Sequence, residues 1–248
     1  METGSLILAN YTAKIKDTGE IIETTLEEEA KKLGVYDPSR KYEPRLISVG
    51  DGWVLKGLDE ALASAGVGDR LTVELLPEKA FGERDSSKVR LIPIRKFGEK
   101  AADLFVGGTV EIDDKAGVVR SMGSGRVQVD FNHRLAGKVL IYDVEIIKML
   151  DDDDSKVDAL LKRRLPIEVG QISSNIEDGI VRIRLPSDYI IEGVQVAKKA
   201  LSSDIFKFLE AINKVVFIEE YEAPKPKEEV KTKEESPKTE VAVNNPSK

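Results

Sequence analysis

The chain has 248 residues, of which 41% are hydrophobic and 33% are charged, with a formal net charge of −7. This length accommodates up to three small domains, and the negative charge argues against general nucleic-acid binding, which requires a basic face. The chain contains no cysteine, which excludes disulfides, thiol catalysis and zinc–thiolate sites. No apolar run reaches the roughly 20 residues that span a membrane, and the N-terminal residues lack the pattern of a secretory signal. We therefore expect no membrane partner and a cytoplasmic location.

The N-terminal third of the sequence predicts a β-rich unit. Residues 5–24 alternate in polarity around a turn at Asp17-Thr18-Gly19, which is typical of a β-hairpin. A charged connection over residues 25–45 contains one helical stretch, at 26–33. A short helix follows, with Leu58, Ala61, Leu62 and Ala65 on one face, and a strand is predicted over 69–76.

Short strands separated by glycine turns predict a second, smaller β domain. They are expected at residues 89–93, 109–113, 117–119 and 126–129, with Gly123-Ser124-Gly125 as a hairpin turn. Residues 139–147 are rich in β-branched side chains. This stretch is too apolar for an edge strand, so we expect it to lie inside the first sheet.

The acidic run Asp151–Asp154 is interpreted as a linker, because four adjacent carboxylates repel one another when packed. A calcium site is the alternative, but the glycine and glutamate of a calcium-binding loop are missing. Beyond it, strands are predicted at 165–172, 179–185 and 215–218, and helices at 195–201 and 204–212. The basic run Lys162-Arg163-Arg164 is expected to be solvated surface. Residues 223–248 have the composition of a disordered tail.

Three motifs, in this order, carry a resemblance to a known family. They are Gly52-Trp53-Val54-Leu55-Lys56-Gly57-Leu58-Asp59-Glu60-Ala61-Leu62 with Val67-Gly68-Asp69-Arg70 after it, then Ala80-Phe81-Gly82, then the stretch from Val129 to Gly137. The series resembles the FKBP-type peptidyl-prolyl isomerases, specifically the SlyD-like branch with an inserted chaperone domain and its long archaeal members.

The resemblance implies an α+β multidomain fold. An FKBP-like twisted antiparallel sheet around one short helix would comprise residues 1–83 and 132–150, and an insert-in-flap β domain residues 84–131. After the linker at 151–154, residues 155–222 would form a separate C-terminal α/β domain, followed by the tail at 223–248.

The resemblance also implies an apolar site for a proline-containing chain. The positions that match the family's site are Tyr11, Ile22, Glu23, Val54, Leu55, Leu58, Phe81, Leu140 and Tyr142. Three of them depart from the usual pattern: Leu58 replaces a tryptophan, Glu23 replaces an aspartate, and Phe81 lacks a tyrosine hydroxyl. These departures imply weaker ligand recognition.

The chemistry expected of such a site is rotation about an X–Pro bond, whose barrier is roughly 18–20 kcal/mol. An apolar site that binds the twisted amide more tightly than the planar one suffices for catalysis, with Glu23 as an electrostatic neighbour. No cofactor or metal is required. The histidine-rich nickel tail of some relatives is missing, and His133 is expected to be an ordinary loop residue.

In the family the insert binds unfolded polypeptides and raises their concentration near the isomerase site. The apolar residues expected to contribute here are Leu91, Ile92, Ile94, Phe97, Leu104, Phe105 and Val106. The leading hypothesis is therefore a prolyl isomerase that is also a folding chaperone. A non-catalytic holdase with a decayed pocket is the alternative. Residues 155–222 could also join two chains in a homodimer, although a monomeric core explains their apolar pattern equally well.

Overall fold

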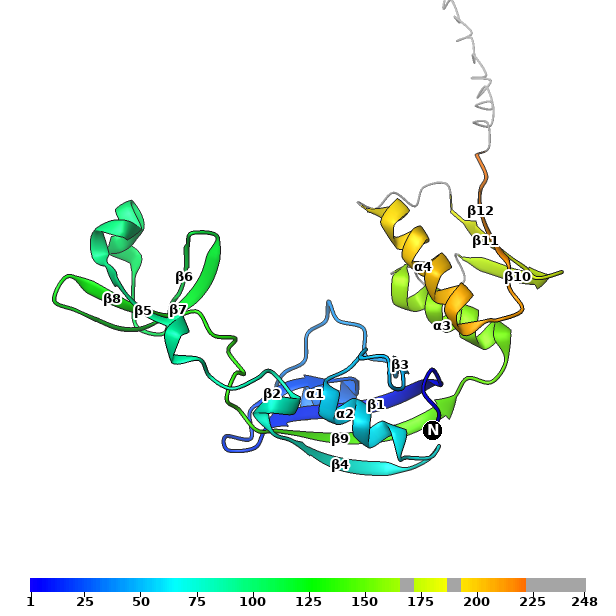
Figure 1. The fold of residues 1–248 in the computed structure, drawn as a ribbon, viewed down its shortest axis with the longest axis horizontal. Helices are drawn as coiled ribbons and strands as arrows, with labels where there is room; N and C mark the ends of the chain where they lie inside the picture. The colour runs from blue at the N-terminus through cyan, green and yellow to red at the C-terminus, as the bar shows by residue number, and fades with distance from the viewer. Residues whose placement is uncertain (166–171, 187–192, 222–248) are drawn as a thin grey trace, which may run out of the picture.

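A computed structural model describes residues 1–165, 172–186 and 193–221 (Figure 1). The described chain is α+β, with three sheets of five, three and four strands and few helices. Its buried apolar side chains form three core clusters, one centred on each sheet, and the cluster of the C-terminal sheet also includes Leu6 and Leu46 of the first sheet. The predicted fold class is therefore confirmed at the level of an α+β chain with antiparallel sheets.

The first sheet positions the candidate site. Its strands run in the order β2-β1-β9-β4, all antiparallel, and β3 also pairs with β1. The apolar stretch predicted to be internal is β9, which lies between β1 and β4. The bounds are β1 Leu6–Ile15, β2 Ile21–Thr24, β3 Arg45–Ser48, β4 Arg70–Leu75 and β9 Leu140–Met149, with helices α1 Glu27–Lys32 and α2 Lys56–Ala63.

Helix α2 covers one face of this sheet (Figure 1). It buries Leu58 and Leu62 against the alternate residues of β1 and β9 that point to the same side. Gly57 allows a close approach, because a Cβ at this position would stand 2.6 Å from Cδ2 of Leu75 on β4. The helix and the sheet therefore pack with no space for a larger residue at position 57.

The inserted unit is a four-stranded sheet of order β5-β8-β7-β6. Its strands lie at the predicted places, and the β7–β8 hairpin turns at Ser124 and Gly125, both with positive φ. The 3₁₀ segment η3, which packs Phe97 into the small core, was not predicted. The bounds are η1 Pro77–Lys79, η2 Ser86–Lys88, β5 Val89–Pro93, η3 Ile94–Asp103, β6 Thr109–Ile112, β7 Lys115–Gly123 and β8 Arg126–Asp130.

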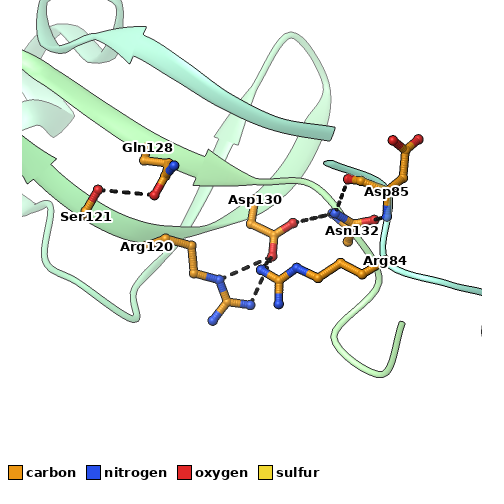
Figure 2. A network of polar contacts seen from close by, with 7 residues as sticks. All are labelled: Arg84, Asp85, Arg120, Ser121, Gln128, Asp130 and Asn132. Atoms are coloured by element: carbon orange, nitrogen blue, oxygen red, sulfur yellow. Dashed lines mark hydrogen bonds and ion pairs between the residues drawn. The ribbon is translucent and has the colours of Figure 1, made fainter. Parts of the chain in front are cut away.

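A polar network joins the two chain segments that connect this unit to the first sheet (Figure 2). Asp130 is buried and binds Arg84 and Arg120, and its other oxygen accepts hydrogen bonds from the backbone and side-chain N–H groups of Asn132 at 3.0 and 2.8 Å. The side-chain amide of Asn132 in turn bonds the backbone of Asp85. Its Oδ1 accepts the Asp85 N–H at 2.9 Å, and its Nδ2 donates to the Asp85 C=O at 2.8 Å. The entering and leaving segments are thus held together at one buried carboxylate.

The described residues of the C-terminal unit form two helices and a three-stranded sheet of order β10-β11-β12. Its bounds are α3 Asp153–Arg164, β10 Ser173–Glu177, β11 Ile180–Leu185, α4 Val194–Phe208 and β12 Lys214–Glu219. The strand pair β11–β12 is parallel, and the strands predicted at 179–185 and 215–218 are confirmed. Most of the strand predicted at 165–172 and the tail at 223–248 lie outside the described residues.

Two predictions for this unit are wrong. The acids at 151–154 are not a linker: Asp152 caps helix α3, its carboxylate accepting the N–H of Ser155 at 2.8 Å, and Asp153 and Asp154 lie in the first turn. Carboxylates there interact favourably with the free N–H groups and the helix dipole, which offsets their repulsion. The two helices predicted over 195–212 are one continuous helix, α4.

The C-terminal unit is also less separate than predicted. Leu6 and Leu46 of the first sheet, and Leu150 directly after β9, belong to the same core cluster as Leu160 and Leu161 of α3. Trp53 packs against this cluster as well. The back of the first sheet and the C-terminal helices therefore form a continuous apolar interface.

Candidate active site

Two tyrosines lie side by side on the face of the sheet that α2 covers. Tyr11 on β1 is opposite Val144, and Tyr142 on β9 is opposite Ala13, so the two rings are diagonal neighbours across the strand pair. Their centroids are 5.7 Å apart and the ring planes are tilted by 46°. The small side chain of Ala13 leaves room for this arrangement.

All the predicted apolar site residues belong to a single cluster. Tyr11, Leu58, Leu140 and Tyr142 are buried in it. Four half-buried side chains pack against them and remain accessible from outside: Ile22 from β2, Val54 and Leu55 from the loop before α2, and Phe81 after η1. The arrangement has an aromatic and aliphatic floor with an accessible apolar rim.

The loop that carries Val54 and Leu55 is fixed by a buried carboxylate that the sequence reading did not single out. Asp59 accepts the backbone N–H groups of Gly50 at 2.7 Å and Gly52 at 3.0 Å. Both glycines have positive φ, a conformation that side chains disfavour. The loop therefore reaches the cluster in one defined conformation.

The same loop touches the C-terminal unit. The ring of Trp53 meets Phe208 of α4 edge-on at a centroid distance of 5.5 Å, and the guanidinium of Arg163 lies 3.7 Å from the Trp53 centroid. Lys207 of α4 forms a 2.6 Å ion pair with Asp51. Helices α3 and α4 therefore support the residues that precede Val54 and Leu55.

These contacts partly correct the expectation for the basic run. Lys162 is exposed, as expected of solvated surface. Arg163 is also partly exposed to solvent, but its guanidinium lies over the ring of Trp53. Arg164 forms a bidentate ion pair with Asp204, with distances of 2.6 and 3.0 Å. Two of the three cations thus have structural partners.

Glu23 lies at the edge of the cluster and is held by two arginines that the sequence reading missed. Its carboxylate accepts Arg45 at 3.0 Å and Arg40 at 3.4 Å. Burial, followed by the negative charge of Glu23, raises the pKa of Tyr11 above its usual range. The same two causes raise the pKa of Tyr142 to about 12, against an opposing effect of Arg45. Both phenols therefore keep their protons near neutral pH.

His133 has a more specific place than the expected loop position. Its ring stacks on Phe81 with a centroid distance of 4.4 Å and an interplanar angle of 9°. The backbone N–H of Leu135 donates to His133 Nδ1 at 3.2 Å, which orients the ring. The only signal in the sequence was that His133 lies within the motif from Val129 to Gly137.

In the inserted unit, the predicted client-binding residues divide into two groups. Leu91, Phe105 and Val106 expose 60%, 66% and 61% of their surface, and Ile94 exposes 37%. Ile92 and Phe97 are buried in the small core, and Leu104 packs against it. Ile92 and Phe97 thus belong to the part of the predicted set that fills the core of this small sheet, and client contact by the exposed residues stays a prediction.

An open groove of about 790 Å³ accompanies the exposed group. It is lined by Leu104, Phe105 and Val110 on its apolar side, and by charged residues of η3 such as Lys96 and Glu99. Among residues 1–165, 172–186 and 193–221, no three His, Cys, Asp or Glu side chains are grouped so that they could hold a metal ion. No helix in the described part of the chain is long and apolar enough to cross a membrane.

Comparison with known proteins agrees with this arrangement. Residues 90–135 match the family model "FKBP26, IF domain" and residues 153–222 match "FKBP26_C-terminal". A short-type peptidyl-prolyl cis-trans isomerase of Methanocaldococcus jannaschii is 31% identical over 146 residues, which is 59% of this chain and 92% of the relative. The chain belongs to the FKBP-type peptidyl-prolyl cis-trans isomerase family.

Further relatives place the chain near the SlyD-like members of the FKBP family. The FKBP-type 16 kDa peptidyl-prolyl cis-trans isomerase of Escherichia coli is 27% identical over 153 residues, covering 60% of this chain and 93% of the relative. The SlyD protein of Helicobacter pylori is 25% identical over 139 residues, covering 53% and 75%. The predicted membership of the SlyD-like and archaeal branch is confirmed.

Proposed function

We propose that the protein is a peptidyl-prolyl cis-trans isomerase and folding chaperone, with the Tyr11–Tyr142 cluster as its isomerase site. The observation that carries the proposal is the gathering of the matched residues, from five separate segments of the chain, into one apolar cluster with an accessible rim. Membership of a family whose members are named as isomerases supports the activity.

The chemistry follows from the apolar character of the cluster. A planar X–Pro amide has strong charge separation, and part of it is lost when the bond twists. Apolar walls built from Ile22, Val54, Leu55 and Phe81 disfavour the planar amide relative to the twisted one. A differential of about 5 kcal/mol would give an acceleration of roughly 10³–10⁴.

The buried phenols contribute neutral hydrogen-bond donors to this site. Both phenols remain protonated near pH 7; the Tyr11 hydroxyl is directed to Glu23, and the Tyr142 hydroxyl can donate to a carbonyl of the substrate. Glu23 is fixed by Arg40 and Arg45 and acts on the phenols through its charge. None of these groups has to transfer a proton, because the reaction is a rotation.

The inserted unit supplies the chaperone function in this proposal. Leu91, Phe105 and Val106 present apolar surface to an unfolded polypeptide, and the covalent connection keeps that polypeptide close to the isomerase site. Unfolded and proline-containing polypeptides are thus the partners, and a cytoplasmic location stays a prediction.

A homodimer through the C-terminal unit also stays a prediction. Val196 and Phe206 expose apolar surface on helix α4, which supports a partner there. Light scattering on the full-length protein and on a Val196→Ser/Phe206→Ser variant tests it, with a halved mass expected for the variant.

A protease-coupled assay on a proline-containing tetrapeptide tests the isomerase proposal, and suppression of aggregation of a denatured protein tests the chaperone proposal. We expect the intact protein to be active in both. If the protein suppressed aggregation but did not accelerate isomerisation of the tetrapeptide, the non-catalytic holdase would be favoured.

A further inference from the structure

A cleft of about 680 Å³ lies between the first sheet and helix α3, outside the Tyr11–Tyr142 cluster. Its walls come from β2, the connection before β3, the last residues of β9 and one face of α3. Leu8, Leu46 and Leu150 form its apolar base, where the C-terminal unit packs against the sheet.

The charge of this cleft is opposite to that of the whole chain. Its lining contains seven cationic residues and three acidic ones, whereas the full chain carries a net charge of −7. The cations are Arg40, Lys41, Arg45 and Lys148 from the sheet side, and Lys162, Arg163 and Arg164 from α3. We call it the basic cleft.

Several of these cations already have anionic partners within the protein. Arg40 and Arg45 share Glu23, and Lys41 lies 3.5 Å from Glu43. Within the described part of the chain, Lys148 and Lys162 have no ion-pair partner within 4.0 Å, and both are exposed. These two lysines face the same space from opposite walls, so an anionic ligand between them would be attracted by both.

The basic cleft adjoins the candidate isomerase site. Glu23 and Thr25 line the cleft, and the Thr25 hydroxyl accepts the backbone N–H of Tyr11 at 2.9 Å. Glu23 also acts electrostatically on both site tyrosines. Leu8 and its partner Lys148 point to the back of the sheet, whereas Tyr11 and Tyr142 point to the face that α2 covers. A polypeptide bound at the rim of the cluster thus reaches the basic cleft by passing around the edge of the sheet at Glu23.

We propose that the basic cleft binds acidic segments of client polypeptides whose proline is held at the Tyr11–Tyr142 cluster, around the β2 edge of the sheet. This inference rests on the proposed function and adds a substrate preference to it. An acidic polypeptide fits better than a nucleic acid, because the cleft combines cations with an apolar base, and the acidic remainder of the chain repels a long polyanion.

The test is fluorescence anisotropy with labelled proline peptides of equal length. One set carries four glutamates on the N-terminal or the C-terminal side of the proline, and the other carries serines in their place. We expect the protein to bind one glutamate peptide about tenfold more tightly than its serine counterpart, with a preference that declines as salt is raised.

A charge-reversed variant, Lys148→Glu/Lys162→Glu, locates the effect. It should lose the preference for glutamate, while its rate on a short uncharged tetrapeptide stays that of the wild type. The matched control is Lys199→Glu/Lys214→Glu, which makes the same change in net charge at exposed lysines of the C-terminal unit outside the cleft. The control should retain the preference.

Equal affinity for glutamate and serine peptides would overturn the inference, as would an equal loss of preference in the control variant. Tighter binding of a single-stranded RNA oligonucleotide, sensitive to the same two lysines, would overturn it in favour of a nucleic-acid site. A glutamate preference in a protein without tetrapeptide activity would contradict the proposed isomerase function but support the cleft as a binding site.

Discussion

The guanidinium of Arg163 lies 3.7 Å from the centroid of the Trp53 ring, and this contact joins helix α3 to the loop that carries Val54 and Leu55. Trp53 is the only tryptophan in the chain, so its fluorescence reports on the contact. Replacing Arg163 with Ala removes a cation–π contact and the cover over the ring. We expect a red-shifted emission and a loss of about 1 kcal/mol in the free energy of unfolding.

The neighbouring Lys162→Ala variant serves as the control for that measurement, because Lys162 is exposed and lies one residue away. Its emission should match that of the wild type. An unchanged spectrum for Arg163→Ala would show that the two units do not keep this contact in solution.

Phe81 offers a test of the missing phenolic hydroxyl. A Phe81→Tyr substitution adds a donor at the accessible rim, and one hydrogen bond of about 1 kcal/mol corresponds to roughly fivefold tighter binding of a proline peptide. Calorimetric titration measures the change, with Phe206→Tyr on exposed α4 surface as the control. Unchanged affinity for Phe81→Tyr would place the peptide carbonyl away from this residue.

The Asp130 network predicts a local effect on the inserted unit. Burial alone would raise the pKa of Asp130, but hydrogen bonds from Asn132 and Arg120 and the charge of Arg84 hold it below its usual value. Asp130→Asn keeps the size of the side chain and removes its charge. We expect a loss of about 2 kcal/mol in local stability, since both arginines are partly solvated.

Hydrogen exchange of the amides in β5 and β8 measures this loss. The tetrapeptide rate should stay unchanged, because none of the network residues belongs to the Tyr11–Tyr142 cluster. Unaltered protection in Asp130→Asn would mean that the strands alone hold the insert together.

The buried phenols predict a loss of stability in alkali. A phenol whose folded pKa exceeds its unfolded pKa of about 10 contributes stability that is fully present below pH 10 and is lost as the pH rises towards 12. Each such phenol adds up to about 1.4 kcal/mol per pH unit to that loss. Urea unfolding at pH 8, 10 and 11 should therefore show a shallower decline for Tyr142→Phe than for the wild type. If the free energy of unfolding declined equally with pH in both proteins, the raised pKa of Tyr142 would be contradicted.

The exposed apolar residues of the insert predict a separable chaperone defect. Phe105→Ser/Val106→Ser should abolish most of the suppression of aggregation while leaving the tetrapeptide rate intact, because both residues expose more than half of their surface. The matched control replaces the same residue types on α4, with Phe206→Ser/Val196→Ser. A defect of equal size in both variants would show only a general dependence on surface hydrophobicity.

Much of the strand pattern could be predicted because local sequence decides it. The alternation in residues 5–24 and the β-branched run at 139–147 correspond to β1, β2 and β9. Helix α4 was divided in two at Ser202 and Ser203, which favour turns, yet their hydroxyls bond back to the carbonyls of Lys198 and Lys199 within the helix. Helix α3 was missed because its first acids resemble a solvated run until their position at a helix N-terminus is known.

The site residues were predicted from the family resemblance, since periodicity alone makes Tyr11 and Tyr142 ordinary core aromatics. Their supporting contacts could not be predicted. Arg163 and Phe208 lie more than a hundred residues from Trp53 in the sequence, and only the packing of α3 and α4 on the first sheet brings them together. The same packing creates the basic cleft.

The most direct test of the account is exchange NMR on a short Ala–Pro peptide, with the wild type and Tyr142→Ala compared at equal concentration. The wild type should bring the cis and trans signals into rapid exchange, and Tyr142→Ala, still folded by circular dichroism, should lower the rate at least tenfold. A folded Tyr142→Ala protein that catalyses as fast as the wild type would contradict the assignment of catalysis to the Tyr11–Tyr142 cluster.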